Sequence, residues 1–522
     1  MGLSTAMLEP LRSRALVEED DSPTVSIADR RTPELVFAFV GAVASGTTTT
    51  AKLLGRILHD EYGYTVQHYK VSDRIIECAK NVGEAFDDSL AGFARTNRLQ
   101  DIGNRLREEF SGEYIVEKCI EQIAFKRAEE GYSEADAESG QAAAPLPLRR
   151  AHLIDSLKHP EEVTILREVY GEIFWLIAVF APEDVREKRL VRGGFSKADI
   201  GPLMSRDEHE EIEYGQKVRQ TIHLADFFVR NDKDNMSSLS ETASRYCSIL
   251  FNTLIQTPTR DETAMFNAMA AASRSACMSR QVGASIYSEK GELIGIGWND
   301  VPKCDGGLYS VEDKDNDHRC YLWGDRVCHN DHEKDKLYSA ITSALMTERL
   351  ISDAASEADI RRVLKKTDIR SLIEFSRAVH AEMEAIISVA RGGKKGLRRA
   401  TLYSTTFPCH SCARHIVASG IKRVVYVEPY PKSLALHLHD DAVSLDEKDV
   451  NKVVFLQYEG VAPRNMLRLF NHGVDRKSEG AIIERDKKSA FPVFPLPLDS
   501  YATREQMVVV SLSEREKKRS KG

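Results

Sequence analysis

The chain has 522 residues, of which 42% are hydrophobic, 29% charged and only 7% aromatic, a composition typical of a soluble globular protein with two or three domains. No apolar run is long enough to cross a membrane, the polar N-terminus lacks the apolar core of a secretory signal, and nine cysteines fit a reducing cytoplasm better than a disulfide framework. The net charge of −8 argues against a nucleic-acid polyanion as the main partner, whereas a small anion in a local basic pocket remains compatible with it.

Residues 34–255 alternate strand and helix patterns. We expect residues 1–33 to form a flexible leader and residues 129–148, rich in Ala, Glu, Ser and Pro, to form a mobile loop. The predicted strands cover 35–40, 151–155, 174–180 and 225–229. This alternation predicts an α/β domain over 34–255, with a mostly parallel sheet covered by helices on both faces.

A glycine-rich loop follows the first predicted strand and precedes a helix pattern that starts at Ala51. Strand, glycine loop and helix are the context of a phosphate-binding P-loop, whose backbone amides cradle phosphates. Thr48 offers a hydroxyl for Mg²⁺, and Asp155 at a later strand end is its expected acidic partner. The predicted nucleotide-binding residues are therefore Gly41, Ser45, Gly46, Thr47, Thr48 and Asp155.

Thr47 stands where the Walker motif has lysine, so the cation that stabilises a transferring phosphate is missing. Arg186, Arg189 and Arg192, spaced three apart on a predicted helix, could compensate as lid arginines do, although a solvated basic face is the commoner meaning of such spacing. We expect nucleotide binding more than phosphoryl transfer. A decayed kinase fold that serves as a scaffold is the alternative.

The sequence pattern resets near residue 256, and a second domain is predicted over 256–507, followed by a solvated basic tail over 508–522. Within it, residues 381–391 are predicted to form a helix and residues 400–407 a buried strand. Pro408 opens the next helix, and a further strand is predicted over 423–427.

Two short motifs in this second domain carry chemistry. His380-Ala-Glu382 is followed 26 positions later by Pro408-Cys-His-Ser-Cys412. A neutral imidazole and two thiolates suit a catalytic Zn²⁺, which lowers the pKa of bound water to about 7. His380, Cys409 and Cys412 are the expected ligands, and Glu382 is the expected proton carrier. A Cys-x-x-Cys pair alone also fits a structural zinc knuckle or a redox pair, but the His-x-Glu motif on a preceding helix favours catalysis.

These motifs resemble the signature of zinc-dependent nucleobase deaminases. Further segments in the same order resemble deoxycytidylate deaminases, namely Cys277-Met-Ser-Arg-Gln-Val-Gly-Ala284, Gly297-Trp-Asn299, Gly420-Ile-Lys-Arg-Val-Val-Tyr426 and Gly460-Val-Ala-Pro-Arg464. A P-loop kinase-like domain followed by such a deaminase is similar to the bacterial antiphage dCTP deaminases.

The resemblance implies an α/β/α cytidine deaminase-like C-terminal domain and a cytoplasmic homo-oligomer. It implies zinc-dependent hydrolysis of dCTP or dCMP to deoxyuridine nucleotides and ammonia, which depletes dCTP for an infecting phage. It also places Asn299 against the deoxyribose or phosphate and Tyr430 against the phosphate. The alternatives are a turn residue for Asn299 and plain packing for Tyr430.

Two departures bear on regulation. Asp300 replaces the glycine that commonly follows the matching Asn, and we expect its carboxylate to repel a regulatory triphosphate there. A long insertion then separates Asn299 from His380. By resemblance to some phage members, Cys277 and Cys304 are candidate ligands of a second, structural zinc, with His329 or His332 and Cys328 or Cys320 from the insertion; ordinary buried cysteines and surface histidines are the alternative.

Two other functions compete with nucleotide deamination. A polynucleotide cytidine or tRNA adenosine deaminase shares the zinc motif but should show a basic, aromatic-lined groove. A third interpretation is a binding module whose P-loop domain senses a second nucleotide, an inhibitory RNA or a protein regulator, with catalysis secondary.

Overall fold

The computed structural model describes residues 31–130, 146–208, 210, 214–232, 236–352, 355–430, 433–471 and 475–519. It divides into two compact units: residues up to Thr257 together with those from Leu467 form unit 1, and Pro258–Met466 form unit 2. The leader predicted over 1–33 and the loop predicted over 129–148 lie largely outside the described residues. Among the described residues, no helix combines the length and apolar character needed to span a bilayer.

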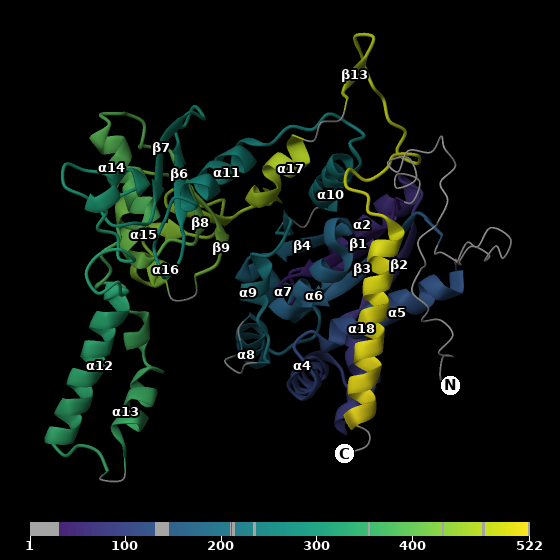
Figure 1. Cartoon of the computed structure of the whole chain (residues 1–522), viewed down its shortest axis with the longest axis horizontal. Helices are drawn as coiled ribbons and strands as arrows, with labels where there is room; N and C mark the ends of the chain where they lie inside the picture. Colours follow the sequence, from purple (N-terminus) through teal and green to yellow (C-terminus); the bar gives the residue numbers. More distant parts are fainter. Residues whose placement is uncertain are drawn as a thin grey trace. The chain divides into compact units, whose positions relative to one another are not determined.

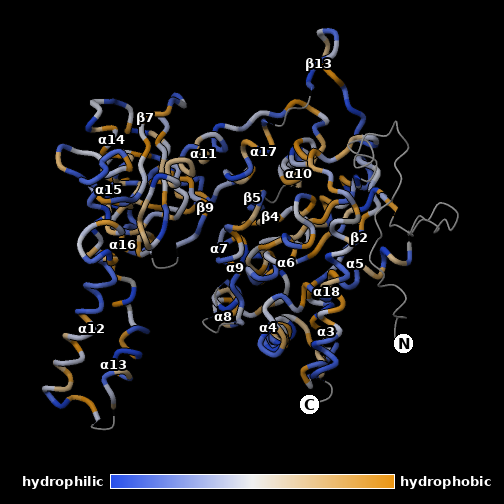
Figure 2. Tube along the Cα trace, in the orientation of Figure 1, coloured by the Kyte–Doolittle hydropathy of each residue, from blue (hydrophilic) through white to orange (hydrophobic). Residues whose placement is uncertain are grey.

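Unit 1 contains a parallel sheet with strands in the order β5-β4-β1-β3-β2. Helices cover both faces of this sheet (Figure 1). The strands are β1 Leu35–Val40, β2 Thr65–Lys70, β3 Arg150–Leu157, β4 Phe174–Phe180 and β5 Phe227–Arg230. All six residues of β1 are buried, and hydrophobic residues gather along the central strands (Figure 2), as expected for parallel strands covered on both sides.

The helices of unit 1 are numbered along the chain. They are α2 Thr47–Asp60, α3 Val71–Cys78, η2 Ala79–Val82, α4 Gly92–Glu109, α5 Tyr114–Glu130, α6 Pro160–Tyr170, η3 Gly171–Ile173, α7 Glu183–Arg192, α8 Lys197–Glu208, α9 Val218–Ile222, α10 Met236–Phe251 and α18 Leu498–Arg519. A small hairpin pairs β13 Lys477–Ser478 with β14 Ala481–Ile482.

The predicted end of the second domain and the predicted basic tail differ from the structure. Residues from Leu467 belong to unit 1 rather than to the domain predicted over 256–507, and α18 includes 508–519 of the predicted tail 508–522. This helix packs against α5, with Leu512 fully buried and Arg515 paired with Glu117. The helix is amphipathic, so apolar residues at helical spacing bury one side while its basic residues stay at the surface.

Unit 2 has a mixed sheet with strands in the order β10-β11-β9-β8-β6-β7. The strands of this sheet are β6 Gly283–Tyr287, β7 Leu293–Trp298, β8 Thr401–Thr406, β9 Arg423–Glu428, β10 Val443–Ser444 and β11 Val453–Gln457, and the short β12 Gly460–Val461 lies outside it. Strand β6 runs antiparallel to both neighbours, and the pairs β8–β9, β9–β11 and β10–β11 are parallel.

Helices cover both faces of this second sheet. Its helices are α11 Arg260–Ala272, η4 Val311–Asn316, α12 His329–Thr347, α13 Glu357–Leu364, η5 Asp368–Ser371, α14 Ala381–Arg391, α15 His410–Ala418, α16 Ala435–Leu438 and η6 Pro463–Asn465, with α17 Met466–Phe470 at the chain boundary between the units. Figure 1 shows α14 and α15 on one side of the strands and α11 on the other, an α/β/α arrangement. The paired helices α12 and α13 belong to the insertion and extend away from the sheet.

Candidate metal centre

Two helices of unit 2 begin at the predicted metal motif. His380 is the N-cap residue of α14, with an extended backbone, and Cys409 is the N-cap residue of α15. A close approach fixes the start of α14: a Cβ added to Gly297 of β7 would lie 2.3 Å from the carbonyl oxygen of Ala381. Only glycine allows this packing, so Gly297 lets the helix press its first turn against the sheet.

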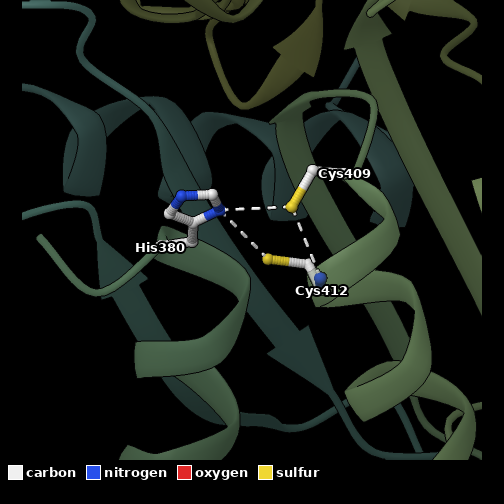
Figure 3. Close-up of side chains that lie close together, drawn as sticks. All are labelled: His380, Cys409 and Cys412. Carbon is white, nitrogen blue, oxygen red and sulfur yellow. Dashed lines mark hydrogen bonds between the residues drawn. The ribbon is translucent and has the colours of Figure 1, made fainter. Parts of the chain in front are cut away.

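The three predicted ligands meet at these helix starts (Figure 3). His380 Nδ1 lies 3.3 Å from Cys409 Sγ and 3.4 Å from Cys412 Sγ, and all three donor atoms lie within 4.8 Å of one another. Zinc bonds of about 2.0 Å to nitrogen and about 2.3 Å to sulfur, at tetrahedral angles, separate such donors by about 3.5 Å. The spacing and the donor set therefore fit Zn²⁺.

The electrostatics of the cluster prepare it for a metal. A hydrogen bond from Cys412 and the neighbouring His380, against the opposing effect of burial, lower the pKa of Cys409 to about 4. The hydrogen bond with Cys409 raises the pKa of His380 to about 9, and the same partner together with burial raises the pKa of Cys412. Cys409 is thus held as a thiolate, whereas His380 and Cys412 release protons when a metal binds.

Glu382 lies in the first turn of α14, beside the three ligands. Its side chain is buried, and Glu382 Oε2 accepts a hydrogen bond from Cys412 Sγ at 3.6 Å. Burial raises the pKa of this carboxyl group. A carboxyl group that titrates closer to neutral pH gains and loses a proton more readily at working pH, which suits a proton carrier.

A cavity of about 230 Å³ opens onto the cluster, and both His380 and Glu382 line it. Its walls come from the loop before β6, from the residues that follow β7, from the insertion and from Tyr430 after β9. This volume is somewhat below the roughly 300–1,000 Å³ that is usual for small-molecule sites.

The structure gives Asn299 a definite set of contacts. Asn299 lines the cavity, but its Nδ2 donates to the carbonyl of Arg280 at 2.8 Å and its Oδ1 accepts from the amide of Val282 at 2.7 Å. The side chain therefore holds the 280–282 loop in place. An amide group keeps one further donor and one further acceptor site beyond these bonds.

Two cavity-lining arginines were not singled out as functional in the sequence. Arg280 forms an ion pair with Glu428, and burial lowers its pKa. Arg377 of the insertion lies over the Trp323 ring, with 4.0 Å from its guanidinium carbon to the ring centre. Together with Tyr430, these side chains add positive charge and a hydroxyl to a cavity that is otherwise largely apolar. Of the two, only Arg280 could have been identified from the sequence, because it lies inside the Cys277–Ala284 motif.

Asp300 lines the cavity, and its expected repulsion of a regulatory triphosphate stays a prediction. Its side chain is buried, and its carboxylate accepts from the amides of Ala276 and Val301, both at 2.9 Å. Arg319 Nη1 of the insertion lies 3.8 Å away. Asp300 therefore connects the loop before β6 with the insertion. A glycine at this position could not form these contacts, because it has no side chain.

The structure places the candidate ligands of a second zinc in different surroundings. Cys277 lines the cavity, as do Cys320, Cys328 and His329, whereas Cys304 is exposed and its thiol donates to Asp305. Within the described ranges, the His380 cluster is the one group of three or more such ligands already close together.

The predicted P-loop residues form the turn between β1 and α2. Gly46 caps α2 with a left-handed backbone, φ 95°, and Thr47 and Thr48 open the helix. Ser45 is fully buried. Asp155 lies at the end of β3, paired with Phe39 of β1, and its side chain is 5% exposed. The structure thus brings the loop and Asp155 to the carboxyl edge of adjacent strands, where ligands bind in such sheets.

Known proteins each resemble a part of the chain. Residues 258–428 match the family model described as the cytidine and deoxycytidylate deaminase zinc-binding region. The deoxycytidylate deaminase of Enterobacteria phage T4 is 30% identical over 161 residues, which are 30% of this chain and 72% of that enzyme. A UPF0200 protein of Saccharolobus islandicus is 26% identical over 140 residues, 26% of this chain and 61% of that protein. Among solved structures, the dCMP deaminase of cyanophage S-TIM5 in apo form covers 39% of this chain and 100% of its own, with 16% identity and a TM-score of 0.22.

Proposed function

The chain belongs to the deoxycytidylate deaminase family, and from this premise we propose that unit 2 hydrolyses the 4-amino group of a deoxycytidine nucleotide. The C4–N4 bond breaks, a water oxygen becomes the C4 carbonyl, and the deoxyuridine nucleotide and ammonia leave. The observation that carries this proposal is the buried Glu382 carboxyl beside the His380, Cys409 and Cys412 donors, on one cavity.

When bound, Zn²⁺ supplies a Lewis acid that makes hydroxide available near neutral pH. His380, Cys409 and Cys412 would hold the metal at the inner end of the cavity. Glu382 takes one proton from the attacking water and delivers it to N3 of the ring. It then takes the remaining hydroxyl proton as the C4 carbonyl forms and delivers that proton to the leaving 4-amino group. Burial of Glu382 supports this role, since a raised pKa balances proton uptake against proton release.

The cavity also supports recognition of a phosphorylated substrate. Arg280 and Tyr430 lie on it together, and Arg280 provides a charge-assisted donor for a phosphate oxygen. Tyr430 adds a hydroxyl donor from the segment after β9. Asn299 holds the loop that carries Arg280, so it positions this anion site even where it does not touch substrate.

The resemblance to antiphage dCTP deaminases extends the proposal to dCTP as a substrate and to depletion of dCTP during phage infection, by a cytoplasmic homo-oligomer. The net charge of −8 supports a nucleotide over a polynucleotide substrate.

A single assay separates these substrates. Purified full-length protein is incubated with dCMP, dCTP, CMP, CTP or single-stranded DNA, and product is measured by HPLC together with released ammonia. We expect turnover of dCMP or dCTP that exceeds turnover of the ribonucleotides. Deamination of single-stranded DNA without turnover of either deoxynucleotide would overturn the proposal in favour of a polynucleotide deaminase.

A further inference from the structure

The loop between β1 and α2 has the backbone shape of an anion cradle. Ala44 and Gly46 both have left-handed backbones, with φ 62° and φ 95°. Left-handed residues in such a loop turn successive amides toward one concave side. A Cβ added to Gly46 would lie 2.1 Å from Asn231 Nδ2, so this backbone and this close approach both require glycine.

Polar groups of the cradle lack partners. In the part of the chain that the structure describes, no acceptor is found for the amides of Thr47 and Thr48, which begin α2 without a side-chain cap. The fully buried Ser45 hydroxyl also has no hydrogen-bond partner. It faces into the loop, because a Cβ added to Gly41 would lie 2.4 Å from Ser45 Oγ. An oxyanion ligand would satisfy donors of this kind.

A lysine from another strand end reaches the same loop. Lys158 follows β3, and its Nζ lies 3.2 Å from the carbonyl oxygen of Gly41. Its side chain is 20% exposed. Lys158 therefore brings a cation to a loop that has threonine at the lysine position, Thr47.

An acidic side chain occupies the cradle in this structure. Asp207 Oδ2 accepts from the amide of Val43 at 2.6 Å, and Asp207 Oδ1 lies 2.8 Å from Lys158 Nζ. Gln100 Nε2 also donates to Oδ1, at 3.4 Å. The Asp207 side chain is 4% exposed. This carboxylate thus uses a loop amide and the lysine, the two kinds of donor that a phosphate needs.

The helix that carries Asp207 rests directly on the loop. Ile200, Leu203 and Met204 of α8 form an apolar cluster against which Val43 and Ala44 pack. From α7, Arg189 donates to the carbonyls of Ala44 and Ser45, both at 3.2 Å, and so braces the outer side of the loop. On the same helix, Arg186 forms an ion pair with Glu208.

We propose that the 41–48 loop is a phosphate site in which Lys158 supplies the cation missing at Thr47, and in which Asp207 is an internal anion that a polyphosphate ligand displaces. A polyphosphate carries more charge and more oxygens than one carboxylate, so it can engage Val43, Thr47 and Thr48 together with Lys158. Because Asp207 must leave first, its competition lowers the apparent affinity of the site. This site is separate from the proposed deaminase centre, and its test does not depend on that function.

The test is calorimetric titration of the full chain with inorganic tripolyphosphate and, separately, with MgATP, which lacks the cytosine ring of the proposed substrates. Asp207→Asn removes the internal anion but keeps the shape of the side chain. We expect it to bind tripolyphosphate at least about tenfold more tightly than the unaltered chain. Adding Lys158→Gln to that variant should weaken tripolyphosphate binding by at least about tenfold, because the variant loses a hydrogen bond between charged groups.

Two further variants keep the outcome clear. Lys188→Gln, which alters a lysine 67% exposed on α7, is the matched control and should bind like the unaltered chain. Thr47→Lys should restore binding to the Asp207→Asn/Lys158→Gln variant, because it returns the cation to the Walker position. Tighter binding of MgATP than of tripolyphosphate would identify a nucleotide as the ligand, and equal binding would identify the polyphosphate group alone. If folded Asp207→Asn binds neither ligand more tightly than the unaltered chain, or if Lys158→Gln has no effect, the proposal is overturned.

Discussion

Arg127 Nε donates to Glu505 Oε2 at 2.9 Å and so joins two residues 378 positions apart in the chain. The same guanidinium group donates to both carboxylate oxygens of Glu34, and all three side chains are buried. This cluster connects α5, α18 and the residue before β1. The C-terminal helix is therefore part of the core of unit 1.

The Arg127 cluster predicts a large stability effect. Arg127→Met leaves the Glu34 and Glu505 carboxylates buried without their cation, and removing one partner of a buried ion pair typically costs about 3–5 kcal/mol. Glu505→Gln, which keeps the side-chain shape and leaves the Glu34 pair, should cost much less. Urea unfolding followed by circular dichroism measures both. Equal stability of Arg127→Met and the unaltered chain would show that α18 does not depend on this cluster.

Asp261 of α11 predicts a pH dependence of unit 2. Burial alone would raise the pKa of Asp261, but hydrogen bonds from Arg423 and Tyr403 and the charge of Arg423 lower it below its usual value. A lowered folded-state pKa gives stability that is present above the unfolded-state value of about 3.9 and is lost as the pH falls through the folded-state pKa.

We therefore expect Asp261→Asn to lower the unfolding temperature at pH 7 and pH 5 by a similar amount, and the difference from the unaltered chain to shrink below about pH 4. Both Asp261 and Arg423 are about a third exposed, so the effect should stay below about 1 kcal/mol. A difference that grows as the solution becomes more acidic would contradict this assignment of the ion pair.

Metal content follows from the arrangement of the cysteines. The group formed by His380, Cys409 and Cys412 should hold one zinc per chain in zinc-loaded protein. Cys409→Ser should lose that zinc, whereas Cys304→Ser, an exposed position, should keep it. Mass spectrometry of the metal content measures this. Two zinc ions in the unaltered chain and one in Cys304→Ser would instead favour the structural zinc expected by resemblance.

Arg280 and Tyr430 predict how the substrate phosphate is bound. Arg280→Ala should raise the KM for dCMP by at least about tenfold, the loss expected for a charge-assisted hydrogen bond, while kcat changes less. The nucleoside deoxycytidine, which lacks a phosphate, should be affected little. Arg399→Ala, an exposed arginine paired with Glu289, is the control. An equal loss with dCMP and deoxycytidine would place Arg280 outside phosphate recognition.

Much of the fold follows from local patterns. The strands predicted over 35–40 and 174–180 have those bounds in the structure, because continuous apolar runs mark strands buried on both faces. The helix over 381–391 also agrees, since its apolar period and terminal glycines are local signals. Strand β2 was not predicted, because Thr65–Lys70 lies at the edge of its sheet and has only Val66 and Tyr69 as apolar or aromatic residues, too few for a clear strand pattern.

Other features depend on contacts between distant residues. The Lys158–Asp207 pair and the Arg127–Glu505 pair join side chains that no local pattern connects. The sequence showed Asp300 as a substitution but not the amides and the arginine that surround its carboxylate. Residues 508–519 were expected to form a solvated tail because their basic residues are visible in the sequence. The surface of α5 that covers the apolar side of this helix cannot be read from the sequence.

The most direct test of the deaminase assignment is turnover of Glu382→Gln, measured as ammonia release from dCMP and dCTP alongside zinc content. Glu382 has no metal bond in the proposed centre, so this variant should keep its zinc. It should lose turnover by about 10²–10⁴-fold, as expected when a general acid and base is removed. Turnover near that of the unaltered chain, with zinc retained, would contradict the account.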